Sequence, residues 1–265
     1  MITWKHYERF LGSALIPRLS NLPNKSQLLR LLDSSSWSDF LSSLSSIPGF
    51  TSIDKGTDVK DIVNMAKKHV YDEIAEYFLI VDDDRPIGLA LFPEWFVKDK
   101  DSLTIQDMVY AIEKLWSILY SIDDDYLTNV YYEWYRYLLL FLYKRAYTYD
   151  WDLSTIKKVF SSIYDGDKLT TLLEKGEADP QQIAASLGLS YEIGDVPLLD
   201  LEIIVDEYLL LNLRDLAMMS NPLYEIVYYY KALDTTYKNI QIITIGLSSK
   251  LPLKEIELRV RDTYV

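Results

Sequence analysis

The apolar residues between Asn221 and Leu247 recur at alternating intervals of three and four, and this spacing restricts the fold more than any other feature. It places side chains on one face of an α-helix, whereas a strand would need alternation at every second residue. Asn221-Pro222 is typical of a helix start, since Asn caps helices and Pro fits the first helical position. A second helix, Leu253 to about Tyr264, is predicted after Pro252. The apolar stripe consists of Leu223, Ile226, Tyr230, Leu233, Tyr237, Ile240, Ile243 and Leu247.

The same periodicity extends along the chain and predicts an all-α fold. Nine Gly and nine Pro in 265 residues leave little material for the many turns of an all-β protein. Pro17 and Pro23 are expected to break the chain, and the apolar segment 87–96 is left without an assignment. The predicted helices cover approximately residues 3–16, 28–32, 37–44, 57–81, 104–122, 126–149, 152–164, 168–175, 180–187 and 197–219.

The composition excludes several function classes. A net charge of −13 opposes nucleic-acid binding, which depends on Lys and Arg neutralising phosphates. The 22 tyrosines are therefore not expected to stack on bases. They are expected at the boundary between core and surface, with the ring buried and the hydroxyl in water. The absence of cysteine excludes disulfides and thiol chemistry. A basic protein is the partner that such an acidic chain suits.

No segment is long and apolar enough to cross a membrane. The run Tyr137–Tyr143 is far shorter than the roughly 20 residues that a transmembrane helix needs. The run Leu198–Leu213 is longer, but acidic residues interrupt it. The first residues lack the apolar core of a signal peptide, so none is expected.

Two aspartate triplets, Asp82–Asp84 and Asp123–Asp125, are the only candidates for a metal site. An all-α enzyme of the isoprenoid-synthase type would bind Mg²⁺ through aspartates one helical turn apart. No second acid follows the later triplet at that spacing, and solvated acids are common at helix ends. His6 and His69 have no identifiable catalytic partner. The sequence therefore predicts no catalytic residue, no cofactor and no metal ligand.

Three segments near the carboxyl end form an ordered series: Tyr228–Ala232, Lys238–Ile243 and Gly246–Ile256. The series resembles the C-terminal signature of the C-type stalk subunit of archaeal and bacterial A/V-type ATPases (ATP synthases), a relative of the d-type subunit of eukaryotic V-ATPases. This chain departs from the pattern where a pair of acids is expected, at Asp234 and Thr236, and has Gln241 in place of Arg.

An internal repeat accompanies this resemblance. Long helices alternate three times with clusters of short ones, and arrays of this kind need neighbouring units to close their cores. The resemblance implies three similar helical-bundle domains in pseudo-threefold arrangement around a funnel. Their approximate boundaries are 1–100, 101–190 and 191–265.

The resemblance also implies a function. The chain would be a non-catalytic central-stalk subunit at the cytoplasmic face of the cell membrane, coupling ATP to ion transport, with protons the expected ion. It would link the D and F proteins of the shaft to the membrane proteolipid (c/K/L) ring, without cofactor and without spanning the membrane itself. The alternatives are a helical-repeat adaptor for another basic protein and a Mg²⁺-dependent isoprenoid-type enzyme.

Acidic residues of the predicted helix 197–219 and of the segment before it are the candidate partner interface. Glu202 and Asp206 are four residues apart and share a helical face, and two further acids lie nearby. The alternative is an ordinary solvated face. The candidate interface residues are Asp195, Asp200, Glu202 and Asp206.

Overall fold

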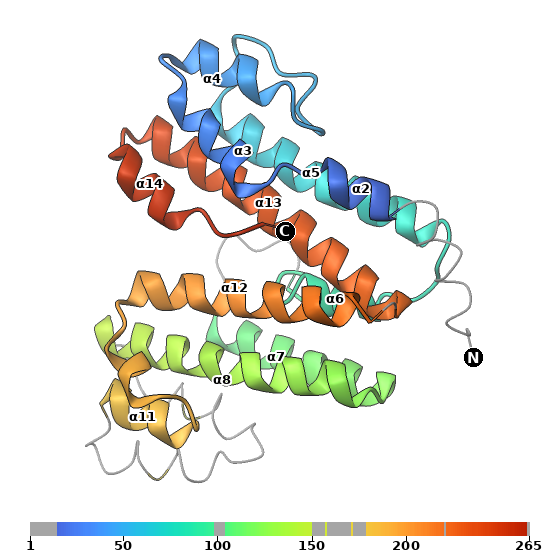
Figure 1. Ribbon diagram of the computed structural model, residues 1–265, viewed down its shortest axis with the longest axis vertical. Coiled ribbons are helices and arrows are strands. Elements are labelled where there is room, and N and C mark those ends of the chain that lie inside the picture. Colours follow the sequence, from blue (N-terminus) through green and yellow to red (C-terminus); the bar gives the residue numbers. More distant parts are fainter. Residues whose placement is uncertain are drawn as a thin grey trace. The chain divides into compact units, whose positions relative to one another are not determined.

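The computed structural model describes residues 15–97, 104–149, 157, 171, 179–219 and 221–263 (Figure 1). Throughout these residues the regular elements are helices and no strand occurs, so the predicted all-α class is confirmed. The predicted helices 3–16, 152–164 and 168–175 lie almost entirely outside the described residues. None of the described helices is both long and apolar enough to cross a bilayer.

The chain divides into two compact units, one formed by residues 1–90 and 213–265 and the other by residues 91–212. We call them unit 1 and unit 2. The division into three domains around a funnel stays a prediction.

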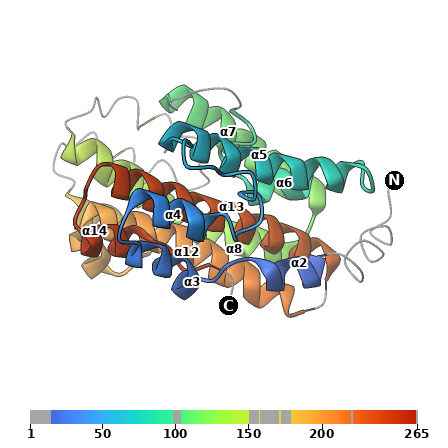
Figure 2. The same ribbon diagram turned by 90° about the horizontal axis from the view of Figure 1, so that it is seen from above.

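Unit 1 is built on two long helices that lie side by side, α5 (Val59–Phe78) and α13 (Pro222–Ser248) (Figures 1 and 2). The ring of Tyr230 lies 5.6 Å from that of Tyr77, and the ring of Tyr237 lies 4.8 Å from that of His69. The two helices are therefore antiparallel. The shorter elements of this unit are α2 (Ile16–Asn21), α3 (Lys25–Leu29), η2 (Arg30–Asp33), α4 (Trp37–Leu44), α6 (Arg85–Ala90) and α14 (Leu253–Arg259).

Side-chain caps explain where several helices of unit 1 begin. The Asp58 carboxylate accepts the Asp61 N–H at 2.8 Å at the start of α5. Ser36 caps α4, and Asn221 caps α13 ahead of Pro222. Each cap satisfies a backbone donor that the first helical turn leaves without an intrahelical partner.

Unit 2 contains α7 (Ile105–Ile122), α8 (Asp125–Thr148), α11 (Pro180–Ser186), η3 (Tyr191–Asp195) and the larger part of α12 (Leu198–Ala217). The buried Trp134 indole N–H of α8 donates to the Val205 carbonyl of α12 at 3.0 Å. Asp123 adopts a left-handed conformation (φ 56°) at the corner between α7 and α8, and Asp124 then caps α8. Asp and Asn tolerate that conformation better than most other non-glycine residues.

Two local predictions need correction, and one unassigned segment can now be described. The helix expected to reach about Tyr264 ends at Arg259, because Val260 is extended and the chain turns back toward α13. Pro17 does not break the chain but lies in the first turn of α2, where a missing N–H costs nothing. The unassigned segment 87–96 contains most of α6 and a run of turns.

Candidate functional site

The structure separates the acids predicted as a partner interface into two kinds. Asp195 and Asp200 are exposed, whereas Glu202 and Asp206 are half-buried. With about 100° of rotation per residue, Asp200 lies about 160° around α12 from Glu202. Glu202 and Asp206 lie instead on the side that carries the buried Leu209.

The half-buried acids already interact with other groups of the protein. This applies to both Glu202 and Asp206. Asp195 and Asp200 are the members of the predicted set that present their carboxylates most openly to a partner.

Lys144 of α8 holds the segment that carries Asp195. Its ammonium group donates to the Gly194 carbonyl at 2.7 Å and also to the Val196 carbonyl. Desolvation lowers the pKa of Lys144, and the negative charge of Asp195 opposes that shift. The start of α12 is thus fixed by a cation inside unit 2.

The aspartate triplets have structural roles at helix boundaries. The Arg85 guanidinium donates to both carboxylate oxygens of Asp83, from Nε to Oδ1 at 2.9 Å and from Nη2 to Oδ2 at 2.7 Å. Asp124 accepts the Leu127 N–H at 2.9 Å and so caps α8. Within the described parts of the chain, no group of three or more His, Asp or Glu side chains is placed to hold a metal ion.

Of the two histidines, His6 lies outside the described residues and His69 lies half-buried in unit 1. The His69 ring packs beside Tyr237, and a Cβ added to Gly49 would come within 2.7 Å of the imidazole. Burial lowers the pKa of His69, and the nearby Glu73, Asp72 and Glu76 act in the opposite direction. The side chain serves as a packing element between α5 and the loop at Gly49.

The segments that carry the family resemblance form one hairpin, α13 followed by α14. Gly246 lies against Ile256 so closely that an added Cβ would come within 2.7 Å of the Ile256 side chain. The Leu251 N–H returns to the Gly246 carbonyl at 3.0 Å and closes the turn. Lys238 forms an ion pair with Asp234 at 2.9 Å along the helix. The signature residues are therefore packing and turn residues of unit 1.

A partly buried polar network lies at the α2, α5 and α13 contact and was not predicted from the sequence. Glu73 is only 17% exposed in its side chain, and it accepts from Arg18 at 2.7 Å and from the Tyr229 hydroxyl at 3.0 Å. The Tyr230 hydroxyl donates to the Glu73 carbonyl at 3.1 Å. Burial, followed by the charge of Glu73, raises the pKa values of both tyrosines far above their usual range. The network joins three helices that are distant in sequence.

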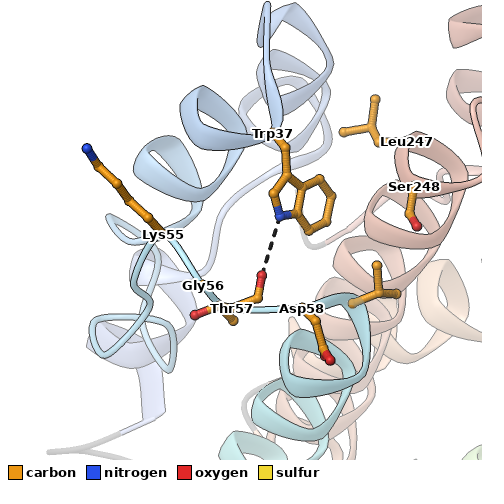
Figure 3. A pocket seen from close by; sticks show the side chains of 8 residues that line it. Trp37, Lys55, Gly56, Thr57, Asp58, Leu247 and Ser248 are labelled. Carbon is orange, nitrogen blue, oxygen red and sulfur yellow. Dashed lines mark hydrogen bonds between the residues drawn. The ribbon is translucent and has the colours of Figure 1, made fainter.

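A hollow of about 470 Å³ opens in unit 1 between the start of α4, the start of α5 and the end of α13 (Figure 3). The Trp37 indole forms one wall and donates its N–H to the Thr57 carbonyl at 3.3 Å. Leu247 and Ser248 form the opposite wall. Periodicity and motifs do not indicate this hollow, because its walls come from segments about 200 residues apart.

Comparisons of the chain with protein-family models, with curated proteins and with solved structures found no match.

Proposed function

We propose that this chain is a non-catalytic coupling subunit of a rotary A/V-type ATPase, positioned between the D/F shaft and the proteolipid ring. The observation that carries the proposal is the C-terminal series Tyr228–Ile256. Within these segments Gly246 packs against Ile256 across the α13–α14 hairpin, and Asn239 binds the backbone of Arg261 after it. The resembling residues thus pack and turn a hairpin, which suits an architectural subunit.

The physical demands of torque transmission also favour this proposal. Close-packed helices resist deformation, and α5 and α13 pack side by side with ring contacts at His69–Tyr237 and Tyr77–Tyr230. A net charge of −13 suits contact with a basic shaft. The exposed carboxylates of Asp195 and Asp200 lie on unit 2, where a basic surface could reach them.

The charge alone would equally suit a helical adaptor for an unrelated basic protein. That second candidate explains the acidic surface but gives no reason for the order of residues in the hairpin. The two functions predict different partners, so a binding experiment separates them.

The proposal is tested by mixing the purified chain with the co-expressed D and F shaft proteins of its source organism. Co-elution from a size-exclusion column, weakened by added salt, is the expected result. Lysozyme, a basic protein without relation to the shaft, is the control. Co-elution with lysozyme but not with the shaft would support the adaptor and contradict the coupling function.

A further inference from the structure

The hollow beside Trp37 combines features that favour a cation. The first is the indole ring, whose face attracts ammonium and guanidinium groups. Figure 3 shows this ring turned toward Leu247 and Ser248, across the open space. The ring edge is already fixed, since its N–H is bonded to the Thr57 carbonyl. The ring also packs against Phe40 at a centroid distance of 5.0 Å, so a ligand would use the part of the indole that lines the hollow.

The second feature is the carboxyl end of α13. Leu247 and Ser248 are the last two residues of this 27-residue helix, and both line the hollow. The carbonyls of Gly246 and Leu247 accept the Leu251 and Lys250 N–H groups of the turn, and the helix end keeps the partial negative charge of the macrodipole. That charge favours a cation at this wall.

The third feature is the negative charge of Asp58, which is another residue that lines the hollow. One of its oxygens accepts the Asp61 N–H at 2.8 Å. Its formal charge, with that of Asp61 in the first turn, offsets the positive amino end of α5. Among the residues that line the hollow, Lys55 alone carries a cationic side chain, and Figure 3 shows its amino group pointing away from the indole.

We propose that this hollow is a binding site for an arginine side chain of a partner protein. The guanidinium group would stack on Trp37 and pair with Asp58, while its aliphatic stem would contact Val59 and Leu247. A volume of about 470 Å³ is ample for a single arginine side chain and lies within the range of ligand pockets. Arginine fits better than lysine because its planar group can stack and pair at the same time. This site belongs to unit 1, whereas the candidate interface acids of α12 belong to unit 2.

The test uses the isolated full chain, with its six tryptophans replaced by 5-fluorotryptophan. Their resonances are followed by ¹⁹F NMR. The resonance of Trp37 is assigned from its absence in Trp37→Phe. N-acetyl-arginine amide is titrated at constant ionic strength, and N-acetyl-citrulline amide serves as its neutral isostere. A saturable shift of the Trp37 resonance with the arginine compound, and none with the citrulline compound, is expected. Equal shifts with both compounds would overturn the proposal.

A pair of charge-removing variants locates the interaction. Asp58→Asn keeps a good helix cap and removes the charge, so the fold is retained while binding weakens by about fivefold. Asp61→Asn removes a charge from the same helical turn without lining the hollow, and its binding curve is expected to match the wild type. An unchanged affinity in Asp58→Asn would show that the guanidinium does not pair there. Because no partner protein is present, this experiment does not depend on the ATPase assignment.

Discussion

The side-chain amide of Asn239 binds the backbone of Arg261 through both of its polar atoms. Its Nδ2 donates to the Arg261 carbonyl at 2.9 Å, and its Oδ1 accepts the Arg261 N–H at 2.9 Å. Asn239 is fully buried in the middle of α13, so this pair attaches the segment after α14 to the core of unit 1. It also explains why α14 ends early, since the returning chain must be extended to meet the amide.

Replacement of Asn239 by Ala is expected to lower the free energy of unfolding by about 2–4 kcal/mol. The change removes two hydrogen bonds and leaves backbone groups buried without partners. Urea denaturation followed by circular dichroism measures the loss. Gln241→Ala, a half-buried position two residues along the same helix, is the control and is expected to change the value by less than about 0.5 kcal/mol. Equal effects of the two substitutions would contradict the role given to Asn239.

Gly246→Ala is expected to destabilise the protein by about 1–3 kcal/mol, although Ala is the better helix former. The new Cβ would meet Ile256 Cγ1 at 2.7 Å and Cδ1 at 2.8 Å, which forces α13 and α14 apart. In the double variant with Ile256→Ala, the clash disappears. The combined loss of unfolding free energy should then fall short of the sum of the single losses by about 1 kcal/mol or more. Strict additivity would show that the two residues do not limit the approach of the helices.

His69 is expected to make the protein less stable as the pH falls. Burial holds its pKa in the folded state below the ordinary value of 6.5. The unfolded chain therefore binds the proton more readily, and stability that is fully present above pH 6.5 decreases as the pH falls toward the folded-state pKa. The urea midpoints of wild type and His69→Gln are compared between pH 7.5 and 5.5.

The carboxylates that face His69 and its neighbours titrate in both proteins, so the difference between the two curves isolates the imidazole. A smaller decline in the variant is expected. Parallel curves would mean that His69 is protonated equally well in the folded and unfolded states.

Asp195→Asn with Asp200→Asn is expected to weaken binding of a basic shaft by about fivefold at low salt, and the difference should shrink as salt is added. Both carboxylates are exposed, so the fold should be retained. Isothermal titration calorimetry supplies the affinities. Glu113→Gln with Glu257→Gln removes the same charge from exposed positions elsewhere and is the matched control. An equal loss of affinity in both double variants would show that only the net charge of the protein matters, and not the position of Asp195 and Asp200.

Helix positions could be predicted from local chemistry to a large extent. The Thr104–Asp107 capping box begins α7 where its polar residues indicate, and Asn221-Pro222 begins α13. These signals lie within a few residues of the boundary that they set. The end of α14 could not be predicted in this way, because it depends on Asn239, a residue about 20 positions earlier.

The candidate sites depend more strongly on contacts that are distant in sequence. Spacing alone groups Glu202 with Asp206, and the same helical geometry separates them from Asp200. Sequence periodicity does not indicate that Glu73 meets Arg18 and Tyr229, or that Trp37 faces Leu247. Those contacts follow from the antiparallel packing of α5 and α13 and from the return of the chain after more than a hundred residues.

Coupling of a shaft to a membrane ring by this chain is tested most directly by affinity purification from detergent-solubilised membranes of the source cells. A tagged copy is captured, and the retained proteins are identified by mass spectrometry. Recovery of the D and F shaft proteins together with a proteolipid is the expected result. Recovery of the chain alone, or with an unrelated basic protein, would contradict the coupling function.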